Sequence, residues 1–339
     1  MKAQAAEKKS PSQEKIFAKV KIGDRFVPAF GLGTLPIGVL YNKGGRPSRE
    51  SAVQLIVEAL NLGLRFIDTS DVYCANSNDM HYSEEVIRDA LLAWDGDISD
   101  VCVATKGGMA RFGDGDTSNS WREVMPFTPT KLRACVQASK KALGGTQPIA
   151  LWQFHHANAY AADDKEFHDL MKAASELIAG GEVGAIGLCN CGVAHIKVAS
   201  KYFKVATVQN EFNLWERKCW IGKVSGAKSN QGGVIPYCVE NGITFMPYGA
   251  LGGNAARNGR RDLVQDFPGV VHIAKAKGVS PHALVLAWMR AKFPNILHIV
   301  GLRELARLEG IREAHGISLT PTEVETIAAM KKPPAARKP

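Results

Sequence analysis

The sequence predicts an α/β protein: a (β/α)8 barrel of the TIM type, with an N-terminal β-hairpin at the barrel bottom. Short apolar runs alternate with amphipathic helical stretches along the chain, which implies a parallel sheet with right-handed crossovers. Eight such units fill about 290 residues between two polar ends. This number of units suits a closed barrel better than an open sheet.

The predicted elements follow in chain order. The strand-like runs lie at 29–33, 64–68, 101–105, 149–154, 183–188, 205–209, 243–247 and 297–301, and helical stretches include 50–62, 83–94, 130–143, 164–179, 281–292 and 304–315. Ser83, Thr128 and Ser280 are predicted to begin three of these helices. Residues 20–27 form a hairpin pattern with a Gly-Asp turn, and a hairpin there can plug the bottom of the barrel.

The alternative fold is a doubly wound sheet, which needs G-x-G-x-x-G after its first strand and a helix directly behind it. Residues 31–36 read GLGTLP, so the third glycine is missing, and no helix is expected at once. We therefore favour the barrel as a single domain over 19–330. Residues 1–18 are expected to form a mobile tail, and 331–339 a loose one.

Two long connections, at 107–128 and 210–231, follow the third and sixth predicted strands. Both lie where strands lead into helices, and barrel enzymes build their sites on that face. Long loops in such positions are commonly functional.

Composition restricts the class of protein. The net charge is +9, but the basic residues are scattered, which disfavours nucleic acid and fits a small anionic ligand. The seven cysteines show neither CxxC nor zinc spacing, so we expect no metal. No secretory signal or membrane-spanning apolar run is evident, so we expect a cytoplasmic protein with reduced thiols, no membrane insertion and no obligate protein partner. A transit peptide remains open, although Glu7 and Glu14 argue against it.

Polar side chains close six consecutive apolar runs: Asp68, Lys106, His155, Asn190, Gln209 and Tyr248. In a parallel barrel these positions meet on one face. Each residue alone has an ordinary explanation, such as a loop cap or a satisfied core histidine, and His156 competes with His155. Together, they indicate one site.

Residues 66–73, FIDTSDVY, resemble the aldo-keto reductase signature F-I-D-T-A-x-x-Y. The resemblance continues in segments 31–34, 83–85, 105–106, 153–155, 186–190 and 208–211, and covers about residues 20–330. It implies an NADPH-dependent reductase of aldehydes or ketones, of the alcohol dehydrogenase or carbonyl reductase type. It also implies a catalytic tetrad of Asp68, Tyr73, Lys106 and His155.

That tetrad suits carbonyl reduction, which needs hydride at carbon and a proton at oxygen. A phenol is protonated at neutral pH and can donate, and an adjacent lysine is expected to lower its pKa by roughly 1–3 units. Asp68 would hold Lys106 in place. His155 would orient the carbonyl oxygen through a hydrogen bond.

The cofactor NADPH/NADP+ is expected to contact several strand ends. Asn190 and Gln209 offer amides to the nicotinamide carboxamide, and Tyr248 matches the ring stacked beneath it. Arg303 and Arg307 can face one phosphate. The expected set is Gly33, Thr34, Asp68, Cys189, Asn190, Gln209, Tyr248, Gly249, Leu251, Gly252, Gly253, Arg303 and Arg307. Three residues depart from the family pattern: Cys189 replaces Ser, Ala150 replaces Asp, and Ile311 replaces an adenine-contacting Asn.

The substrate, a small carbonyl compound, is not specified by the sequence. Its pocket is expected to come from residues of the two long loops: Met109, Phe112, Trp121, Trp215 and Trp220. The alternative function is a cofactor-binding regulatory protein resembling potassium-channel β subunits. Turnover of any aldehyde would separate the two.

Overall fold

The computed structural model describes residues 18–39, 45–110, 123–124, 127–145, 148–224, 230–257 and 259–331. Eight parallel strands form one sheet in the order β11-β10-β9-β8-β5-β4-β3-β12. Their bounds are β3 Phe30–Gly33, β4 Phe66–Asp68, β5 Cys102–Gly107, β8 Leu151–Phe154, β9 Ile186–Cys189, β10 Val205–Glu211, β11 Thr244–Tyr248 and β12 His298–Gly301. Every strand predicted from the sequence is present.

The two edges of this sheet approach each other at the start of β11. Phe245 donates to the carbonyl of Asn295 and accepts from the amide of Leu297, both at 2.9 Å. These bonds tie β11 to the segment that leads into β12. The sheet therefore closes into the expected barrel.

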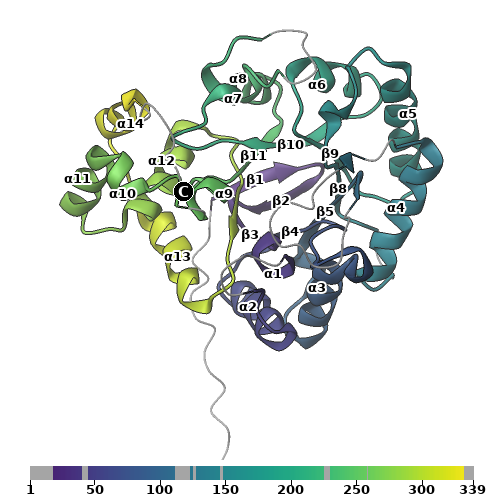
Figure 1. The fold of residues 1–339 in the computed structure, drawn as a ribbon, viewed down its shortest axis with the longest axis horizontal. Helices are drawn as coiled ribbons and strands as arrows, with labels where there is room; N and C mark the ends of the chain where they lie inside the picture. Colours follow the sequence, from purple (N-terminus) through teal and green to yellow (C-terminus); the bar gives the residue numbers. More distant parts are fainter. Residues whose placement is uncertain are drawn as a thin grey trace, which may run out of the picture.

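Helices surround the strands (Figure 1). The longer ones are α2 Arg49–Asn61, α3 Tyr82–Ala93, α4 Pro129–Ala142, α5 Lys165–Ala179, α11 Pro268–Lys277, α12 Pro281–Lys292, α13 Leu308–Gly316 and α14 Pro321–Ala329. Short helices are α1 Leu35–Gly38, α6 Val193–Ala199, α7 Lys218–Ile221, α8 Val234–Glu240, α9 Gly253–Arg257 and α10 Leu263–Asp266. The six predicted helices are confirmed with small shifts; α13 begins later because a 3-10 turn, Leu305–Arg307, precedes it.

Helix starts test the capping predictions. Thr128 accepts from the amide of Lys131, and Ser280 from that of Ala283, so both caps are confirmed. The Ser83 prediction is wrong: α3 begins one residue earlier, and the Ser83 hydroxyl donates to the Tyr73 carbonyl at 2.7 Å. The expectation that no helix follows the first barrel strand is also wrong, since α1 makes a single turn there.

The predicted hairpin is present as β1 Lys19–Ile22 and β2 Arg25–Pro28, and Gly23 in its turn has φ of +57°. Its side chains Val20, Ile22 and Val27 join a buried cluster of barrel residues: Ala29, Phe66, Cys102, Ala104, Leu151, Ala185, Ala206, Met246 and Leu297. Thr244, the first residue of β11, donates to the Lys21 carbonyl at 2.6 Å. The hairpin therefore covers the amino ends of the strands, which is the barrel bottom.

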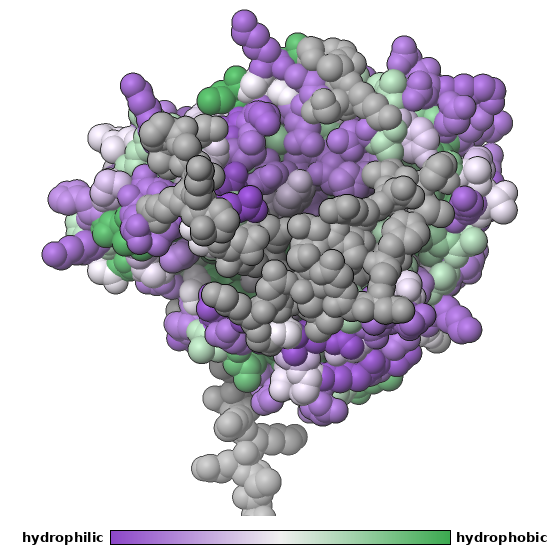
Figure 2. All heavy atoms as spheres, viewed as in Figure 1, coloured by the Kyte–Doolittle hydropathy of each residue, from purple (hydrophilic) through white to green (hydrophobic). Residues whose placement is uncertain are grey.

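The first long connection contains a small antiparallel pair, β6 Met109–Ala110 with β7 Glu123–Val124, and the second contains α7. The predicted tails, apart from Ala18 and Lys331, lie outside the described residues. No described helix has the length and apolar character needed to cross a membrane. Large exposed apolar side chains include Leu92 and Ile221, and hydrophilic residues predominate among the coloured residues of the face in Figure 2.

Candidate active site

Asp68 and Lys106 form a buried ion pair at the carboxyl ends of the neighbouring strands β4 and β5. The Lys106 ammonium lies 2.5 Å from Asp68 Oδ2, 2.7 Å from the Thr69 carbonyl and 3.0 Å from the Tyr73 hydroxyl. The lysine therefore donates to all three groups, and three of the four predicted tetrad members form one contiguous line.

Burial dominates the acid strength of these groups. It raises the pKa of Tyr73 to about 12, and the adjacent Lys106 charge offsets only part of that rise. Lys106 lowers the pKa of Tyr73, as expected, but desolvation of the phenolate is the larger effect, so the pKa is raised overall. Burial is the largest single effect on Lys106 and lowers its pKa, but the charge and hydrogen bond of Asp68 together with the charges of Tyr73 and Cys189 raise that pKa overall.

His155, the fourth tetrad member, follows β8 and lies beside Tyr73, with ring centroids 6.0 Å apart. Its Nδ1 lies 3.1 Å from the Ser70 hydroxyl. Burial and the nearby Lys106 charge hold the pKa of His155 well below its usual range, so the ring is neutral. His156 instead contacts Asn158 at 3.4 Å. The geometry supports His155 over His156.

The second oxygen of Asp68 accepts from two glutamines. Gln209 Nε2 donates to Oδ1 at 2.8 Å and Gln153 Nε2 at 3.5 Å. The Gln153 carbonyl in turn accepts from Thr207 at 3.2 Å and from the Cys189 thiol at 3.7 Å. Gln209, expected at the carboxamide, thus uses one amide proton to hold Asp68. Cys189 is buried and supports Gln153.

Asn190 joins the end of β9 to the histidine and to Tyr248. Its amide donates to the His155 carbonyl at 2.9 Å, and its carbonyl accepts from the Tyr248 hydroxyl at 2.8 Å. Asn190 has φ of +53°, one of two positive values outside glycine among the described residues. Asparagine tolerates this conformation better than most residues, and such positions cluster at functional sites.

The segment after β11 contains the predicted glycines. Gly249, Gly252 and Gly253 have φ of +66°, +102° and +59°, so a side chain at each position would be strained. Arg261 bonds to the Gly252 carbonyl at 3.2 Å and to Glu211 at 3.0 Å. Leu251 packs partly buried against the core.

Near β4, the Thr34 hydroxyl donates to the Asp68 carbonyl at 3.0 Å. A Cβ added to Gly33 would lie 3.4 Å from the Gly301 amide of β12. Both residues therefore pack against strand ends that carry the site.

Arg303 and Arg307 lie beyond β12, as predicted, with Glu304 between them. The Glu304 carboxylate lies 3.7 Å from Arg303 Nε and 3.3 Å from Arg307 Nε. The two guanidinium groups thus share the Glu304 carboxylate, and their contact with a common phosphate stays a prediction. Ile311 is buried in the core, which accounts for the apolar residue at that position.

Of the predicted substrate-pocket residues, Phe112 and Trp121 lie outside the described residues. Met109 is half-buried in β6. Trp215 is buried, donates to Asp266 at 2.9 Å and packs on Phe267. Trp220 packs against Phe293 with ring centroids 5.5 Å apart. These contacts give both indoles a packing role, and their place in a pocket stays a prediction.

Sequence reasoning missed several residues around His155. Phe127 and Tyr160, which the sequence did not single out, line a small cavity of about 10 Å³ beside it, together with His156. The Tyr160 hydroxyl accepts from the Phe127 amide at 2.7 Å. Ser70 and Asp71 lie within the segment that resembles the family signature, and their polar side chains were the available signal.

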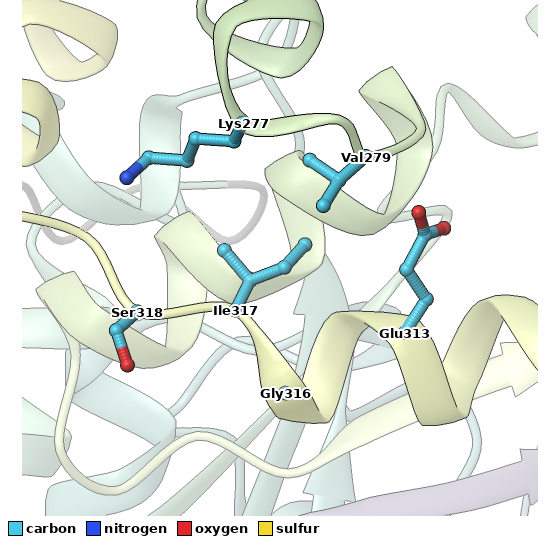
Figure 3. A pocket seen from close by; sticks show the side chains of 6 residues that line it. All are labelled: Lys277, Val279, Glu313, Gly316, Ile317 and Ser318. Carbon is cyan, nitrogen blue, oxygen red and sulfur yellow. The ribbon is translucent and has the colours of Figure 1, made fainter.

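A larger cavity of about 430 Å³ lies elsewhere, between the end of α11 and the end of α13 (Figure 3). It is lined by Lys277, Val279, Glu313, Gly316, Ile317 and Ser318. None of these lining residues is among the residues described above at the site. The cavity has no part in the site.

The fold and the site define a class: a (β/α)8-barrel protein with buried ionisable side chains at the carboxyl ends of its strands. The chain belongs to the aldo/keto reductase family of oxidoreductases, whose profile matches residues 29–332. An uncharacterized oxidoreductase of Schizosaccharomyces pombe is 30% identical over 303 residues, 89% of this chain and 86% of that protein. Pyridoxine 4-dehydrogenase of Escherichia coli is 25% identical over 92% of this chain and 97% of its own length.

Solved structures agree with the fold. An aldo/keto reductase from Klebsiella pneumoniae, solved in complex with NADP and acetate, has a TM-score of 0.69 at 20% identity, covering 92% of this chain and 94% of its own. Glycerol dehydrogenase from Gluconobacter oxydans has a TM-score of 0.70 at 23% identity, covering 91% and 94%.

Proposed function

We propose that this protein reduces an aldehyde or ketone to an alcohol with NADPH, and that Tyr73 is the proton donor. The observation that carries the proposal is the buried line Asp68–Lys106–Tyr73 beside the neutral ring of His155. Two relatives support the cofactor: the Klebsiella structure contains NADP, and a reductase of S. pombe, 26% identical over 91% of this chain, is named for NADP(+).

The residues present fit such a cofactor. Asn190, Gln209 and Tyr248 bring amides and an aromatic ring to the strand ends next to the tetrad. The left-handed glycines after β11 leave backbone amides free of side chains, which suits a pyrophosphate. Arg303 and Arg307 already share a carboxylate, so their charges suit a 2′-phosphate. When bound, the cofactor supplies a hydride to the carbonyl carbon.

The chain itself handles the proton. With its pKa raised to about 12, Tyr73 keeps its proton at neutral pH and can donate it. As the carbonyl oxygen takes that proton, the O–H bond of Tyr73 breaks and a phenolate forms 3.0 Å from the Lys106 ammonium. The ammonium stabilises this anion far better in a buried site than in water. Asp68 keeps the ammonium charged and in position.

The test is a panel of small aldehydes and ketones, with the oxidation of NADPH followed optically and the alcohol product quantified. We expect at least one compound to be turned over with one NADPH oxidised per alcohol formed. The control is Lys106→Met, which removes the charge beside Tyr73 at similar side-chain length and should lose most turnover. If no carbonyl in a broad panel is reduced, or if the Lys106 variant reduces it equally well, the proposal fails.

A further inference from the structure

Ser70 lies between the histidine of the site and a buried carboxylate. Its hydroxyl oxygen is 3.1 Å from His155 Nδ1, 3.0 Å from Asp71 Oδ1 and 3.2 Å from the Lys106 carbonyl. Ser70 is fully buried and Asp71 is 4% exposed. The three side chains form a chain of hydrogen bonds that leads from the site into the protein, and the mechanism above does not use it.

A single hydroxyl proton must serve this arrangement. Ser70 has two acceptors nearby, the Asp71 carboxylate and the Lys106 carbonyl, and its oxygen also accepts from the Val72 amide at 3.4 Å. A charged acceptor forms the stronger hydrogen bond, so Ser70 donates to an ionised Asp71. Its oxygen then accepts from His155, which must carry its proton on Nδ1. Since the ring is neutral, Nε2 is left bare.

Protonation of Asp71 reverses this order. A neutral carboxyl no longer attracts the Ser70 proton as strongly and can itself donate to the Ser70 oxygen. Ser70 is then free to donate to His155 Nδ1, and the ring proton moves to Nε2. With Nδ1 directed at Ser70, Nε2 is the nitrogen left for a ligand.

We propose that Ser70 and Asp71 are positioning residues that decide which nitrogen of His155 carries the ring proton, and so whether Nε2 donates or accepts. The inference rests on the proposed function, because this choice matters when a carbonyl or alcohol oxygen binds at Nε2. A carbonyl oxygen needs a donor and an alcohol hydroxyl can use an acceptor. Protonated Asp71 therefore favours carbonyl binding, and ionised Asp71 favours alcohol binding.

The surroundings of Asp71 place its ionisation in a useful range. Burial and the like charge of Glu84 raise the pKa of Asp71 to about 7, while hydrogen bonds from Cys135 and Ser70 and the charge of His81 act in the opposite direction. The Cys135 thiol of α4 lies 3.2 Å from Asp71 Oδ2. Glu84, buried on α3, accepts from Thr105 and is 2.5 Å from the His81 ring. Both states of Asp71 are therefore accessible near neutral pH.

The test is a ¹⁵N–¹H NMR titration of the ring nitrogens of the full-length protein labelled at histidine, with the His155 signals identified through a His155→Asn variant. Couplings to the ring carbon-bound protons show which nitrogen is protonated, without turnover. We expect the Nε2–H form below about pH 7 and the Nδ1–H form above it. One unchanged form across this range in the wild type would overturn the proposal, whatever the Ser70 and Asp71 variants do.

Three variants sharpen the titration. Asp71→Asn should fix His155 in the Nε2–H form at every pH, because an amide donates where a carboxylate accepts. Ser70→Ala should abolish the pH dependence. Cys135→Ala removes a donor to Asp71 and should move the midpoint to higher pH, whereas a merely structural role would leave it unchanged. An Asp71→Asn variant that still switches would contradict the proposal.

Kinetics separate this inference from the proposed function. In Asp71→Asn, KM for the alcohol should rise roughly tenfold at high pH while kcat for carbonyl reduction changes less. If the ring switches in the titration but no carbonyl is reduced, the proposed function fails and the proton placement holds. If carbonyls are reduced but the position of the His155 ring proton does not depend on Asp71, the proposed role of Ser70 and Asp71 fails and the proposed function stands.

Discussion

The two ends of the barrel are built from opposite kinds of side chain. At the carboxyl ends of the strands, Asp68, Lys106 and Tyr73 are buried together and exchange hydrogen bonds. At the amino ends, the hairpin side chains Ile22 and Val27 pack on an apolar cluster. Buried ionisable groups cost free energy even when paired, whereas apolar burial stabilises. The bottom of this barrel therefore supplies stability, and the top uses part of it to hold reactive groups in place.

This contrast predicts that substitutions separate cleanly into those that change rate and those that change the free energy of unfolding. The largest effect is expected for Tyr73→Phe, which keeps the ring and removes the proton donor. We expect kcat to fall by roughly 10²–10⁴-fold, while Kd for NADPH stays within a few fold. Steady-state kinetics and a fluorescence titration measure the two constants. A variant that retained a third of the wild-type kcat would show that Tyr73 is not the donor.

At the other end, Ile22→Ala should act on stability alone. Ile22 is 2% exposed in the hairpin and packs on the barrel cluster. Removing its buried methyl groups should reduce the free energy of unfolding by about 2–4 kcal/mol, measured by chemical denaturation. Below the melting temperature, kcat should match the wild type. The matched control is Phe26→Ala in the same hairpin, whose side chain is 63% exposed and should matter little. A loss of kcat in folded Ile22→Ala protein would mean that the ends are coupled.

A third expectation concerns the arginines that follow β12, at the carboxyl ends of the barrel strands. Replacing Arg303 and Arg307 together with Ala should weaken NADPH binding by roughly ten- to a hundredfold and leave NADH nearly unchanged. Because these side chains are 36% and 67% exposed, solvent screens their charges, and we expect the loss of NADPH affinity to lie in the lower part of this range. Glu304→Gln is the reciprocal variant, since it removes a competing carboxylate and should strengthen NADPH binding. If the binding of NADPH and of NADH weakened equally, Arg303 and Arg307 would not bind the 2′-phosphate.

Much of the site at the carboxyl ends of the barrel strands could be predicted, because its residues lie at the ends of regular strands. Asp68, Lys106, His155 and Asn190 each follow an apolar run, and parallel topology alone brings them to one face. The Asp68–Lys106 contact was expected, but most of the other side-chain contacts at the site could not be predicted. Gln209 holds Asp68, and Ser70 bonds His155, through side chains 141 and 85 residues apart. Such pairings depend on the barrel's closed geometry and leave no periodic signal.

Short helices also could not be predicted from the sequence. Helices α6 and α8 have seven residues each, too few for an amphipathic repeat to stand out. Ser83 has the residue type of an N-cap but the tertiary contact with the Tyr73 carbonyl takes its hydroxyl. Local propensity therefore gave way to packing where the chain supports the tyrosine.

His298 is a buried polar residue near the amino ends of the strands, and its replacement gives the smallest expected effect. It begins β12, stacks on Phe30 with centroids 4.8 Å apart, and neither ring nitrogen has a hydrogen-bond partner among the described residues. Burial, with a smaller contribution from the Arg290 charge, lowers the pKa of His298 to about 3, from 6.5. Below pH 6.5, His298 is therefore protonated in the unfolded chain but stays neutral in the folded protein. The stability that depends on neutral His298 is complete above pH 6.5 and is lost as the pH falls toward 3.

His298→Leu removes this acid sensitivity together with both unpaired nitrogens. Because one pH unit corresponds to about 1.4 kcal/mol, the unfolding free energy of the variant should gain about that much on the wild type between pH 7 and 5.5. Urea denaturation gives the unfolding free energy of the variant minus that of the wild type at each pH. Comparing this quantity at the two pH values cancels any packing effect that is independent of pH. His282→Leu is the control, because His282 is itself exposed at the start of α12, and a smaller gain is expected there. If the variant and the wild type differed by the same unfolding free energy at the two pH values, His298 would be protonated in the folded protein. The apolar cluster at the amino ends of the strands would then contain a charge.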